Sequence, residues 1–317
     1  MKLRWQLEDP LMPLAPRLVR EIINRSQSSL ARHGELLVES GSYRDADLAI
    51  DLHSDKGPVN LSKSYANQDF VLAWIASPER SLASPRFAIA MADGLSSSRG
   101  AEWAAPAVCF AALDNLVAQK EHRNQPFDSA AAAFQAAGNV LTSMVHAMAE
   151  DKSSCPVGEF PRTWQHILSK GSLLQTTLSI AWYDDSFFYS AVVGDGGIML
   201  RPTGERSGDR EIAKCDLSTS RVHPLKPDMS ERELARYEFT QTPVATTFSG
   251  LMCTDGVARG VDNDLSELLD KLQPQSNGQA QSVVPDFIEE AKRTNPLLFD
   301  DNLTLATFCV TAERLRS

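Results

Sequence analysis

The sequence lacks several features that would assign it to a common class of protein. It has no apolar run approaching the roughly 20 residues that a bilayer-spanning helix needs, and residues 1–10 lack the apolar core of a secretory signal peptide. Its five cysteines are scattered, odd in number and without a Cys-x-x-Cys pair, which argues against a disulfide framework. We therefore expect a soluble protein of the reducing cytoplasm, with buried, reduced thiols and no membrane partner.

The sequence also lacks an excess of basic residues. It carries 31 Lys and Arg against 41 Asp and Glu, a formal net charge of −10. This balance argues against a nucleic-acid partner, which would favour a basic face, and against an acidic membrane surface. The 317 residues, 43% of them hydrophobic, suffice for a sizeable core in one large domain or two small ones.

Motifs of two other enzyme classes are missing. Residues 194–197 are rich in glycine, but they lack the Lys-Ser/Thr pair and the glycine spacing of a nucleotide-binding loop. Residues 96–98 are all serine, but no ordered arrangement of His and Asp accompanies them. A capping turn is the better interpretation of the three serines.

Four aspartates stand at the ends of apolar, strand-like segments. Asp93 and Asp255 each follow such a segment and precede a glycine, whereas Asp69 and Asp301 stand just before one. If these strand ends converge, two of the charges at about 4 Å repel each other by roughly 4 kcal/mol at an effective dielectric of 20. A divalent metal ion is the simplest remedy, and ligands that are all oxygen favour Mg²⁺ or Mn²⁺ over Zn²⁺. Taken singly, each aspartate could instead be a turn residue or a helix cap.

These segments resemble the protein phosphatase 2C family of metal-dependent serine/threonine phosphatases, in its bacterial form. Six motifs carry the resemblance, in the family's order, between residues 48 and 310: Asn67-Gln68-Asp69, Ala92-Asp93-Gly94-Leu95, Gln175-Thr176-Thr177-Leu178, Val193-Gly194-Asp195-Gly196-Gly197, Thr254-Asp255-Gly256-Val257 and Asp300-Asp301-Asn302-Leu303-Thr304. Any one motif is weak, because Asp-Gly is a common turn pair. The ordered set of six is specific.

The order of strand-like and helix-like segments predicts an α+β fold. Apolar patterns predict strands at residues 48–52, 70–76, 87–92, 176–182 and 187–193, and helices at residues 101–119, 127–150, 265–272 and 284–293. The resemblance sharpens this prediction to a four-layer α-β-β-α sandwich of two antiparallel sheets flanked by helices.

The chain divides into an N-terminal extension, residues 1–45, and a catalytic domain, residues 46–317. The extension is predicted to pack on the main domain and to contain a helix at residues 18–30, which follows an extended or turned approach made by Pro10, Pro13 and Pro16. A partner-binding arm is the alternative for this extension. Residues 201–236 are charged and lack sustained periodicity. They are predicted to form a mobile surface insertion or an ordinary long loop.

The resemblance implies a complete metal site. Asp69, Asp93, Asp255 and Asp301 would hold two Mn²⁺ or Mg²⁺ ions, with the backbone carbonyl of Gly94 as a further ligand. A water shared by two such ions loses a proton far more readily than bulk water. The resulting hydroxide would hydrolyse phosphoserine or phosphothreonine without a covalent phosphoenzyme. The implied partners are a phosphoprotein substrate and a cognate Ser/Thr kinase.

Several positions near the site depart from the family's pattern. Gln68 stands where the family usually has Glu, and Ser64 stands where it has a phosphate-binding Arg. Lys63 could supply the positive charge of that Arg, or it could be a solvated loop lysine. Leu95 stands where some relatives have a general-acid His, so protonation of the leaving group has no assigned side chain.

Two further positions bear on a third metal ion. Asp195 matches a residue linked to a weaker third ion in the family, but Arg259 stands where its usual companion would be, four residues after Asp255. A cation there would oppose a third metal, and Arg259 could instead attract the phosphate or pair with a neighbouring acid. The departures at Gln68, Ser64 and Arg259 motivate one alternative, a pseudophosphatase that acts as a binding or regulatory module. The insertion at residues 201–236 motivates another, a phosphatase for a small phosphorylated metabolite with the insertion shaping its pocket, although the insertion could equally dock a protein.

Overall fold

The strands form two stacked antiparallel sheets of six strands each. The computed structural model describes residues 14–56, 67–79, 85–119, 125–150, 173–202, 210–213, 223–244, 247–261, 264–272, 284–295 and 301–311. Sheet A contains, in spatial order, β1 (Gly34–Val38), β4 (Asp69–Ala76), β5 (Phe87–Asp93), β6 (Leu178–Tyr183), β7 (Phe187–Val193) and β10 (Glu238–Pro243). Sheet B contains β2 (Gly41–Arg44), β3 (Leu48–Asp55), β12 (Leu303–Val310), β11 (Phe248–Cys253), β8 (Gly197–Pro202) and β9 (Arg210–Ala213).

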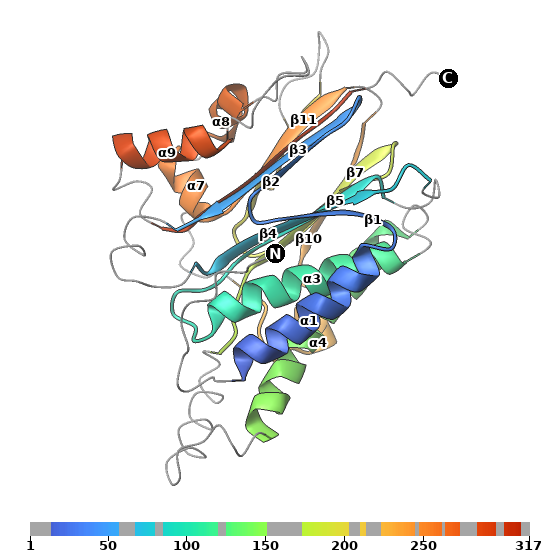
Figure 1. The fold of residues 1–317 in the computed structure, drawn as a ribbon, viewed down its shortest axis with the longest axis vertical. Coiled ribbons are helices and arrows are strands. Elements are labelled where there is room, and N and C mark those ends of the chain that lie inside the picture. Colours follow the sequence, from blue (N-terminus) through green and yellow to red (C-terminus); the bar gives the residue numbers. More distant parts are fainter. Residues whose placement is uncertain are drawn as a thin grey trace.

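Helices cover the outer face of each sheet (Figure 1). Sheet A is covered by α1 (Ala15–Leu30), α3 (Ala101–Ala118) and α4 (Pro126–Glu150), and the short α6 (Glu231–Leu234) packs against α4. Sheet B is covered by α7 (Asp255–Gly260), α8 (Leu265–Leu272) and α9 (Val284–Thr294). The predicted α+β fold, a four-layer α-β-β-α sandwich, is therefore confirmed.

The alternation of side chains along the central strands explains why both sheet faces are buried. In β4, Val71, Ala73 and Ile75 point toward sheet B and join the core between the sheets. The intervening Phe70 and Trp74 point toward the helices and join the second core beneath them. Because successive residues of a strand face opposite ways, a strand buried on both faces appears in the sequence as one continuous apolar run.

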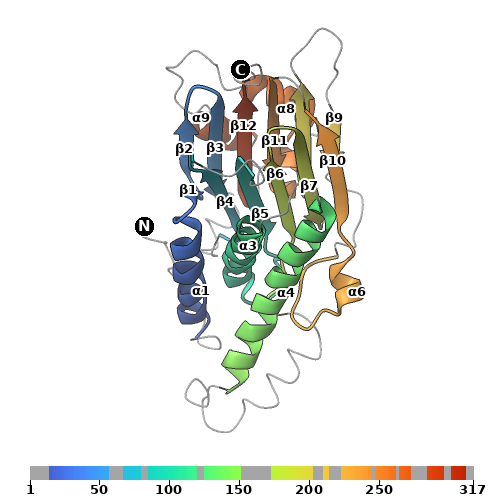
Figure 2. The same cartoon turned by 90° about the vertical axis from the view of Figure 1, so that its right-hand side faces the viewer.

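The helical layer on sheet A is built around α3. This helix contacts β4 and β5 and lies between α1 and α4 (Figure 2). Most of its residues are buried, among them Trp103, Val108 and Leu113, as expected for a helix with protein on several sides. Its first residue, Ala101, follows the loop from Asp93, so the layer also fixes the position of that loop.

The N-terminal segment contributes to all three neighbouring layers. The predicted helix is α1, which packs on α3, while β1 pairs with β4 in sheet A and β2 pairs with β3 in sheet B. The role predicted for Pro16 was wrong: it lies in the first turn of α1 rather than in the approach. Proline is tolerated there because the first helical N–H groups have no partner within the helix. The division at residues 45 and 46 stays a prediction.

Parts of the predicted 201–236 insertion belong to regular elements. Arg201 and Pro202 end β8, residues 210–213 form β9 beside it, and Glu231–Leu234 form α6. Ser230 caps α6 through a reciprocal pair of hydrogen bonds with Glu233. The prediction of an irregular loop was wrong for these residues. β9 forms because it pairs with β8, and α6 forms because Ser230 caps it. Neither element depends on a periodic apolar pattern, so little in the sequence indicates them. Residues 203–209 and 214–222 lie outside the described residues.

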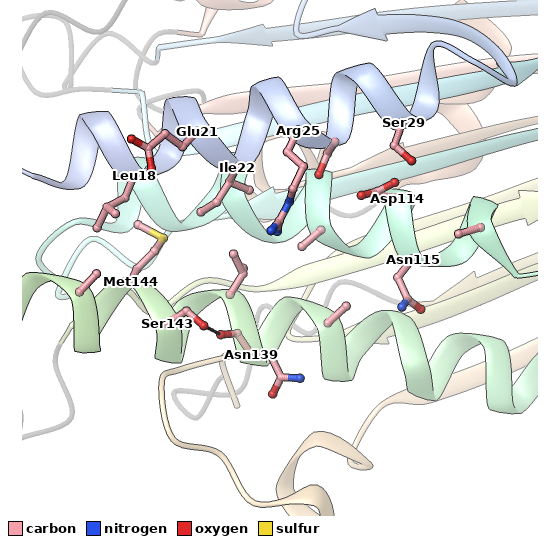
Figure 3. A pocket seen from close by; sticks show the side chains of 16 residues that line it. Leu18, Glu21, Ile22, Arg25, Ser29, Asp114, Asn115, Asn139, Ser143 and Met144 are labelled. Carbon is pink, nitrogen blue, oxygen red and sulfur yellow. Dashed lines mark hydrogen bonds between the residues drawn. The ribbon is translucent and has the colours of Figure 1, made fainter.

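A groove lies on the outer surface of the helical layer (Figure 3). It has a volume of about 770 Å³, with α1 and α4 as walls and α3 as floor; Leu18, Arg25, Asp114, Asn139 and Met144 are among its lining residues. None of the four aspartates lines it. In the part of the chain that the structure describes, no helix is both long and apolar enough to cross a membrane.

Candidate active site

Asp69 and Asp93 are held side by side by the register of sheet A. Asp69 begins β4, Asp93 ends β5, and the two residues are direct partners in the antiparallel pairing. The alternation that turns Val71 and Met91 toward sheet B gives both aspartates the same direction. Directly opposite residues on one face have Cβ atoms about 4.5–5.5 Å apart. The strand pattern therefore places two carboxylates together at the end of the inter-sheet core.

Asp255 and Asp301 come from adjacent strand ends of sheet B. Asp255 is the first residue of α7, just after β11, and Asp301 stands shortly before β12. Because β11 and β12 are antiparallel partners, the end of one lies beside the start of the other. Both carboxylates act electrostatically on Asp69 and Asp93. The two sheets thus bring all four predicted aspartates to one edge of the sandwich.

Thr254 connects the two halves of this cluster. Its hydroxyl Oγ1 donates a hydrogen bond of 2.9 Å to Asp69 Oδ2, and its backbone N–H donates one of 3.0 Å to the carbonyl of Thr304. Thr254 is a site residue that was not predicted from the sequence. Its place directly before the Asp-Gly pair was the available signal, since short hydroxyl side chains bond readily to nearby groups.

Two further threonines hold the backbone around Asp93. The N–H of Asp93 donates to Thr177 Oγ1 at 3.0 Å, and Thr176 Oγ1 donates to the carbonyl of Asp93 at 2.9 Å. The N–H of Thr177 donates to the same carbonyl at 2.7 Å. The Gln175-Thr176-Thr177-Leu178 motif therefore supports Asp93 from the neighbouring strand.

The glycines after Asp93 and Asp255 are required by close packing. A Cβ on Gly94 would lie 2.7 Å from Ala101 Cβ and 2.9 Å from the carbonyl oxygen of Gln68, and the Gly94 N–H donates to that oxygen at 3.1 Å. A Cβ on Gly256 would lie 2.1 Å from the carbonyl oxygen of Asn302. These contacts are too short for any side chain, so the Asp-Gly pairs are more than turn signals.

The pKa values report carboxylates that are buried and crowded together. Burial raises the pKa of Asp69 to about 7, and repulsion from Asp301 and Asp255 adds to the effect. Burial and the charge of Asp69 raise the pKa of Asp93 well above its usual range. Burial also raises the pKa of Asp255, although Arg259 opposes the shift. Burial and the charge of Asp255 raise the pKa of Asp195 to about 6, so the negative charge of the cluster also acts on Asp195.

The cluster fits hard divalent cations by its chemistry. All four side chains offer oxygen only, as Mg²⁺ and Mn²⁺ prefer, and Asp69 Oδ1 is buried without a hydrogen-bond partner. A buried polar atom with no partner is costly, and a cation would satisfy it. The described residues nevertheless contain no group of three or more His, Cys, Asp or Glu already arranged to hold a metal. The oxygens fit the ions, but they are not preassembled around one point.

Arg259 pairs with two of the four carboxylates, which is one reason why their oxygens do not surround a single point. It lies one turn after Asp255 on α7, and its guanidinium pairs with Asp255 and, at 3.2 Å, with Asp301. Of the two roles considered for Arg259, the structure shows pairing with neighbouring acids. Lys63 and Ser64 lie outside the described residues, so the predicted phosphate-binding position stays a prediction.

Cys253 and Arg259 have the Cys-x5-Arg spacing found in thiol-dependent phosphatases, but their geometry excludes that chemistry. The Cys253 side chain is fully buried among apolar residues beneath α7 and α8. Its thiol therefore has no access to a substrate, and Arg259 is engaged by two carboxylates. A reactive cysteine would need a partly exposed, electropositive environment.

Solved structures share this fold. The Mycobacterium tuberculosis serine/threonine phosphatase PstP/Ppp is 19% identical, with a TM-score of 0.56 over 84% of this chain and 99% of that one. PppA, described as a key regulatory component of T6SS in Pseudomonas aeruginosa, is 17% identical, with a TM-score of 0.53 and the same coverage. A search of curated proteins finds no match.

The two stacked antiparallel sheets with helices on their outer faces are the fold of these serine/threonine phosphatase structures. A family model described as protein phosphatase 2C matches residues 56–289, which is most of the chain. The chain therefore belongs to the protein phosphatase 2C family.

The metal-free protein is expected to lose stability as the pH rises from about 4 to about 7. Over this range the unfolded chain has released the proton of Asp69, whose ordinary pKa is about 3.9, while the folded protein keeps it up to a pKa of about 7. The folded state binds more protons, so the free energy of unfolding falls with rising pH. Thermal unfolding in EDTA across this range measures the slope.

Asp69→Asn is the control for this pH dependence. The variant removes one of several carboxyl groups with a raised pKa and should make the slope shallower than that of the wild-type protein, and saturating Mn²⁺ should also make it shallower. Equal slopes for the wild-type protein and Asp69→Asn in EDTA would contradict the prediction.

Proposed function

We propose that the protein is a metal-dependent protein phosphatase that hydrolyses phosphoserine and phosphothreonine. The observation that carries this proposal is the meeting of Asp69 and Asp93 from sheet A with Asp255 and Asp301 from sheet B. Membership of the protein phosphatase 2C family supports it. So does the structure of the PstP catalytic domain in complex with two manganese ions, which is 19% identical with a TM-score of 0.50.

The proposed cofactors are two Mn²⁺ or Mg²⁺ ions. The carboxylates of Asp69, Asp93, Asp255 and Asp301 and the backbone carbonyl of Gly94 would hold them. When bound, such ions supply positive charge for the phosphoryl oxygens and make a water molecule acidic. Asp195 is near enough to be affected by Asp255 and Arg259, but we assign it no ion, because the cation of Arg259 opposes one.

The protein's own residues orient this site. Thr254 fixes one carboxylate oxygen of Asp69 and leaves the other, Oδ1, free for a ligand. Thr176 and Thr177 hold the backbone of Asp93 on both sides. Asp69 and Asp255 are each less than a tenth exposed, so few water molecules compete for their oxygens. Rigid ligands in a partly dry site are what charge stabilisation requires.

The proposed substrate is a phosphoprotein, with a cognate Ser/Thr kinase that supplies it. The proposed location is the cytoplasm, without a nucleic-acid or membrane partner, in keeping with the net charge of −10. Residues 46–317 would form the catalytic domain. Residues 1–45 would form an extension packed on it, a view supported by the packing of α1 on α3.

A binding or regulatory module with the same fold is the second candidate function. The observation that favours it is Arg259, which neutralises part of the cluster and pairs with two of the four aspartates. A protein with a permanent internal cation would not need to take up two metal ions. The four carboxylates weigh against this candidate, because a binding module has no use for their mutual repulsion.

Hydrolysis of a phosphothreonine peptide tests the proposed function. The protein is freed of metal with EDTA, dialysed, and assayed for phosphate release with Mn²⁺, with Mg²⁺ and with EDTA. We expect release with either cation and none with EDTA. No release by a folded protein shown to be loaded with Mn²⁺ would contradict the phosphatase and favour the binding module.

A further inference from the structure

Arg259 lies where it can reach both aspartates of sheet B at once. It is four residues after Asp255 on α7, so the two side chains lie on the same face of the helix. One guanidinium nitrogen pairs with Asp255 Oδ2 and the other with Asp301 Oδ2 at 3.2 Å. The planar fork of arginine suits this double contact. One side chain therefore joins the end of β11 to the start of β12.

The resulting cluster is electrostatically uneven. Asp255 and Asp301 share the positive charge of Arg259, whereas the strongest charges that act on Asp69 and Asp93 come from other carboxylates. The carboxylates of Asp69 and Asp93 on sheet A therefore lie mainly beside other negative charges, whereas Asp255 and Asp301 on sheet B already lie beside the positive charge of Arg259. Two metal positions built from these halves cannot be equivalent.

The side chain of Arg259 can also move away from Asp255 and Asp301. Its side chain is 45% exposed, and Asp301 is 41% exposed, while Asp255 is only 8% exposed. A half-exposed arginine on a helix surface can turn into solvent and be hydrated there. Its two hydrogen bonds to carboxylates are charge-assisted and so stronger than neutral ones. The contact is therefore firm in the absence of another cation and yet reversible.

We propose that Arg259 is an internal competitor of the metal ion, which occupies the carboxylates of Asp255 and Asp301 in the metal-free protein and is displaced when a divalent cation binds there. The proposal rests on the proposed metal site. A divalent cation carries a greater charge than the guanidinium and displaces it at sufficient concentration. Binding of the cation must first break the two contacts of Arg259. Metal binding at Asp255 and Asp301, and with it activity, therefore requires a higher concentration of free divalent cation than it would if Arg259 did not compete.

Metal titration of Arg259→Ala tests this competition without an activity readout. Metal-free wild-type protein and the variant are titrated with Mn²⁺ in a calorimeter, and their thermal unfolding is followed with EDTA and with saturating Mn²⁺. We expect Arg259→Ala to bind its weaker Mn²⁺ ion about tenfold more tightly, in keeping with the loss of two partly exposed charge-assisted contacts. It should unfold at a lower temperature than the wild-type protein in EDTA and at the same temperature in Mn²⁺.

Two further variants make the comparison specific. Arg259→Lys keeps the positive charge but loses the fork, and its Mn²⁺ affinity should fall between those of the wild-type protein and Arg259→Ala. Arg293→Ala removes an arginine that pairs with Glu290 on the surface of α9. It should bind Mn²⁺ as the wild-type protein does.

Two outcomes would overturn the proposal, and they differ in what else they overturn. Equal or weaker Mn²⁺ binding by Arg259→Ala, in a protein whose phosphatase activity depends on metal, would overturn only the competition. No Mn²⁺ binding by either the wild-type protein or Arg259→Ala would overturn the metal site and the proposed function as well.

Discussion

Replacing Asp93 by asparagine is expected to lower phosphate release about a thousandfold or more, because metal ions supply several kcal/mol of transition-state stabilisation and each 1.4 kcal/mol is about tenfold in rate. Asp93 is the partner of Asp69 across β4 and β5, and the charges of Asp255 and Asp301 also reach it. The charges of both halves of the cluster therefore meet at Asp93, as they do at Asp69. An amide keeps its shape but removes the negative charge that holds a cation.

The same substitution is expected to leave the metal-free fold as stable as before, or more stable. Burial and neighbouring carboxylates raise the pKa of Asp93 well above its usual range, which means that its ionised form is unfavourable in the folded protein. Asparagine carries no charge there and leaves the backbone hydrogen bonds of residue 93 with Thr176 and Thr177 in place. Loss of activity together with an unchanged or higher melting temperature in EDTA distinguishes a functional carboxylate from a structural one.

Steady-state assays with Mn²⁺ and thermal unfolding in EDTA test both parts of this prediction. Asp270→Asn is the matched control, because Asp270 is an exposed carboxylate on α8 that pairs with Arg201. It should retain wild-type turnover. Turnover by Asp93→Asn within a few fold of the wild-type rate would contradict the assignment of Asp93 to the metal site.

Replacing Phe308 by alanine is expected to lower the free energy of unfolding by about 3–5 kcal/mol, the usual cost of truncating a fully buried aromatic ring. Phe308 lies on β12 between the sheets and is 0% exposed. Its ring centroid is 5.6 Å from that of Phe87, 5.3 Å from that of Phe188 and 6.4 Å from that of Phe248. The truncation would open a cavity that neighbours in a close-packed core fill only partly.

Gly250 shows how closely the core is fitted to this ring. Gly250 is the partner of Phe308 on β11, and a Cβ there would lie 2.4 Å from the ring. Chemical denaturation of Phe308→Ala measures the loss of stability. Phe127→Ala is the control, since Phe127 is 52% exposed, and it should cost far less. Equal losses for the two variants would contradict the assignment of Phe308 to the inter-sheet core.

Local patterns were sufficient to predict the central elements. The apolar runs that became β4, β5 and β7 are buried on both faces, and such runs stand out in a sequence. The edge strands β1, β2, β9 and β10 were missed, because a short strand with one exposed side has weak alternation and depends on its neighbour for stability. The inner strand β8 was missed as well. The helix α6 was missed for a similar reason, since it is only one turn long and depends on its cap at Ser230.

The sequence by itself determined which residues are proposed as metal ligands and the chemistry that their oxygens allow. Strand ends marked by Asp69, Asp93, Asp255 and Asp301 are local features, and oxygen-only ligands limit the cation whatever the fold. The contacts that orient those residues were decided by the tertiary structure alone. Thr254 reaches Asp69 across 185 positions of the chain.

Arg259 shows the same division. The sequence shows that Arg259 stands four residues after Asp255. Its contact with Asp301 spans 42 positions and exists only because β11 and β12 pair. Helix and strand periodicity fix which way a side chain faces along its own element. They do not fix which side chain of a distant element it meets, because that depends on how the sheets stack. The choice of the proposed ligands was local, and the charge balance of the site is a property of the fold.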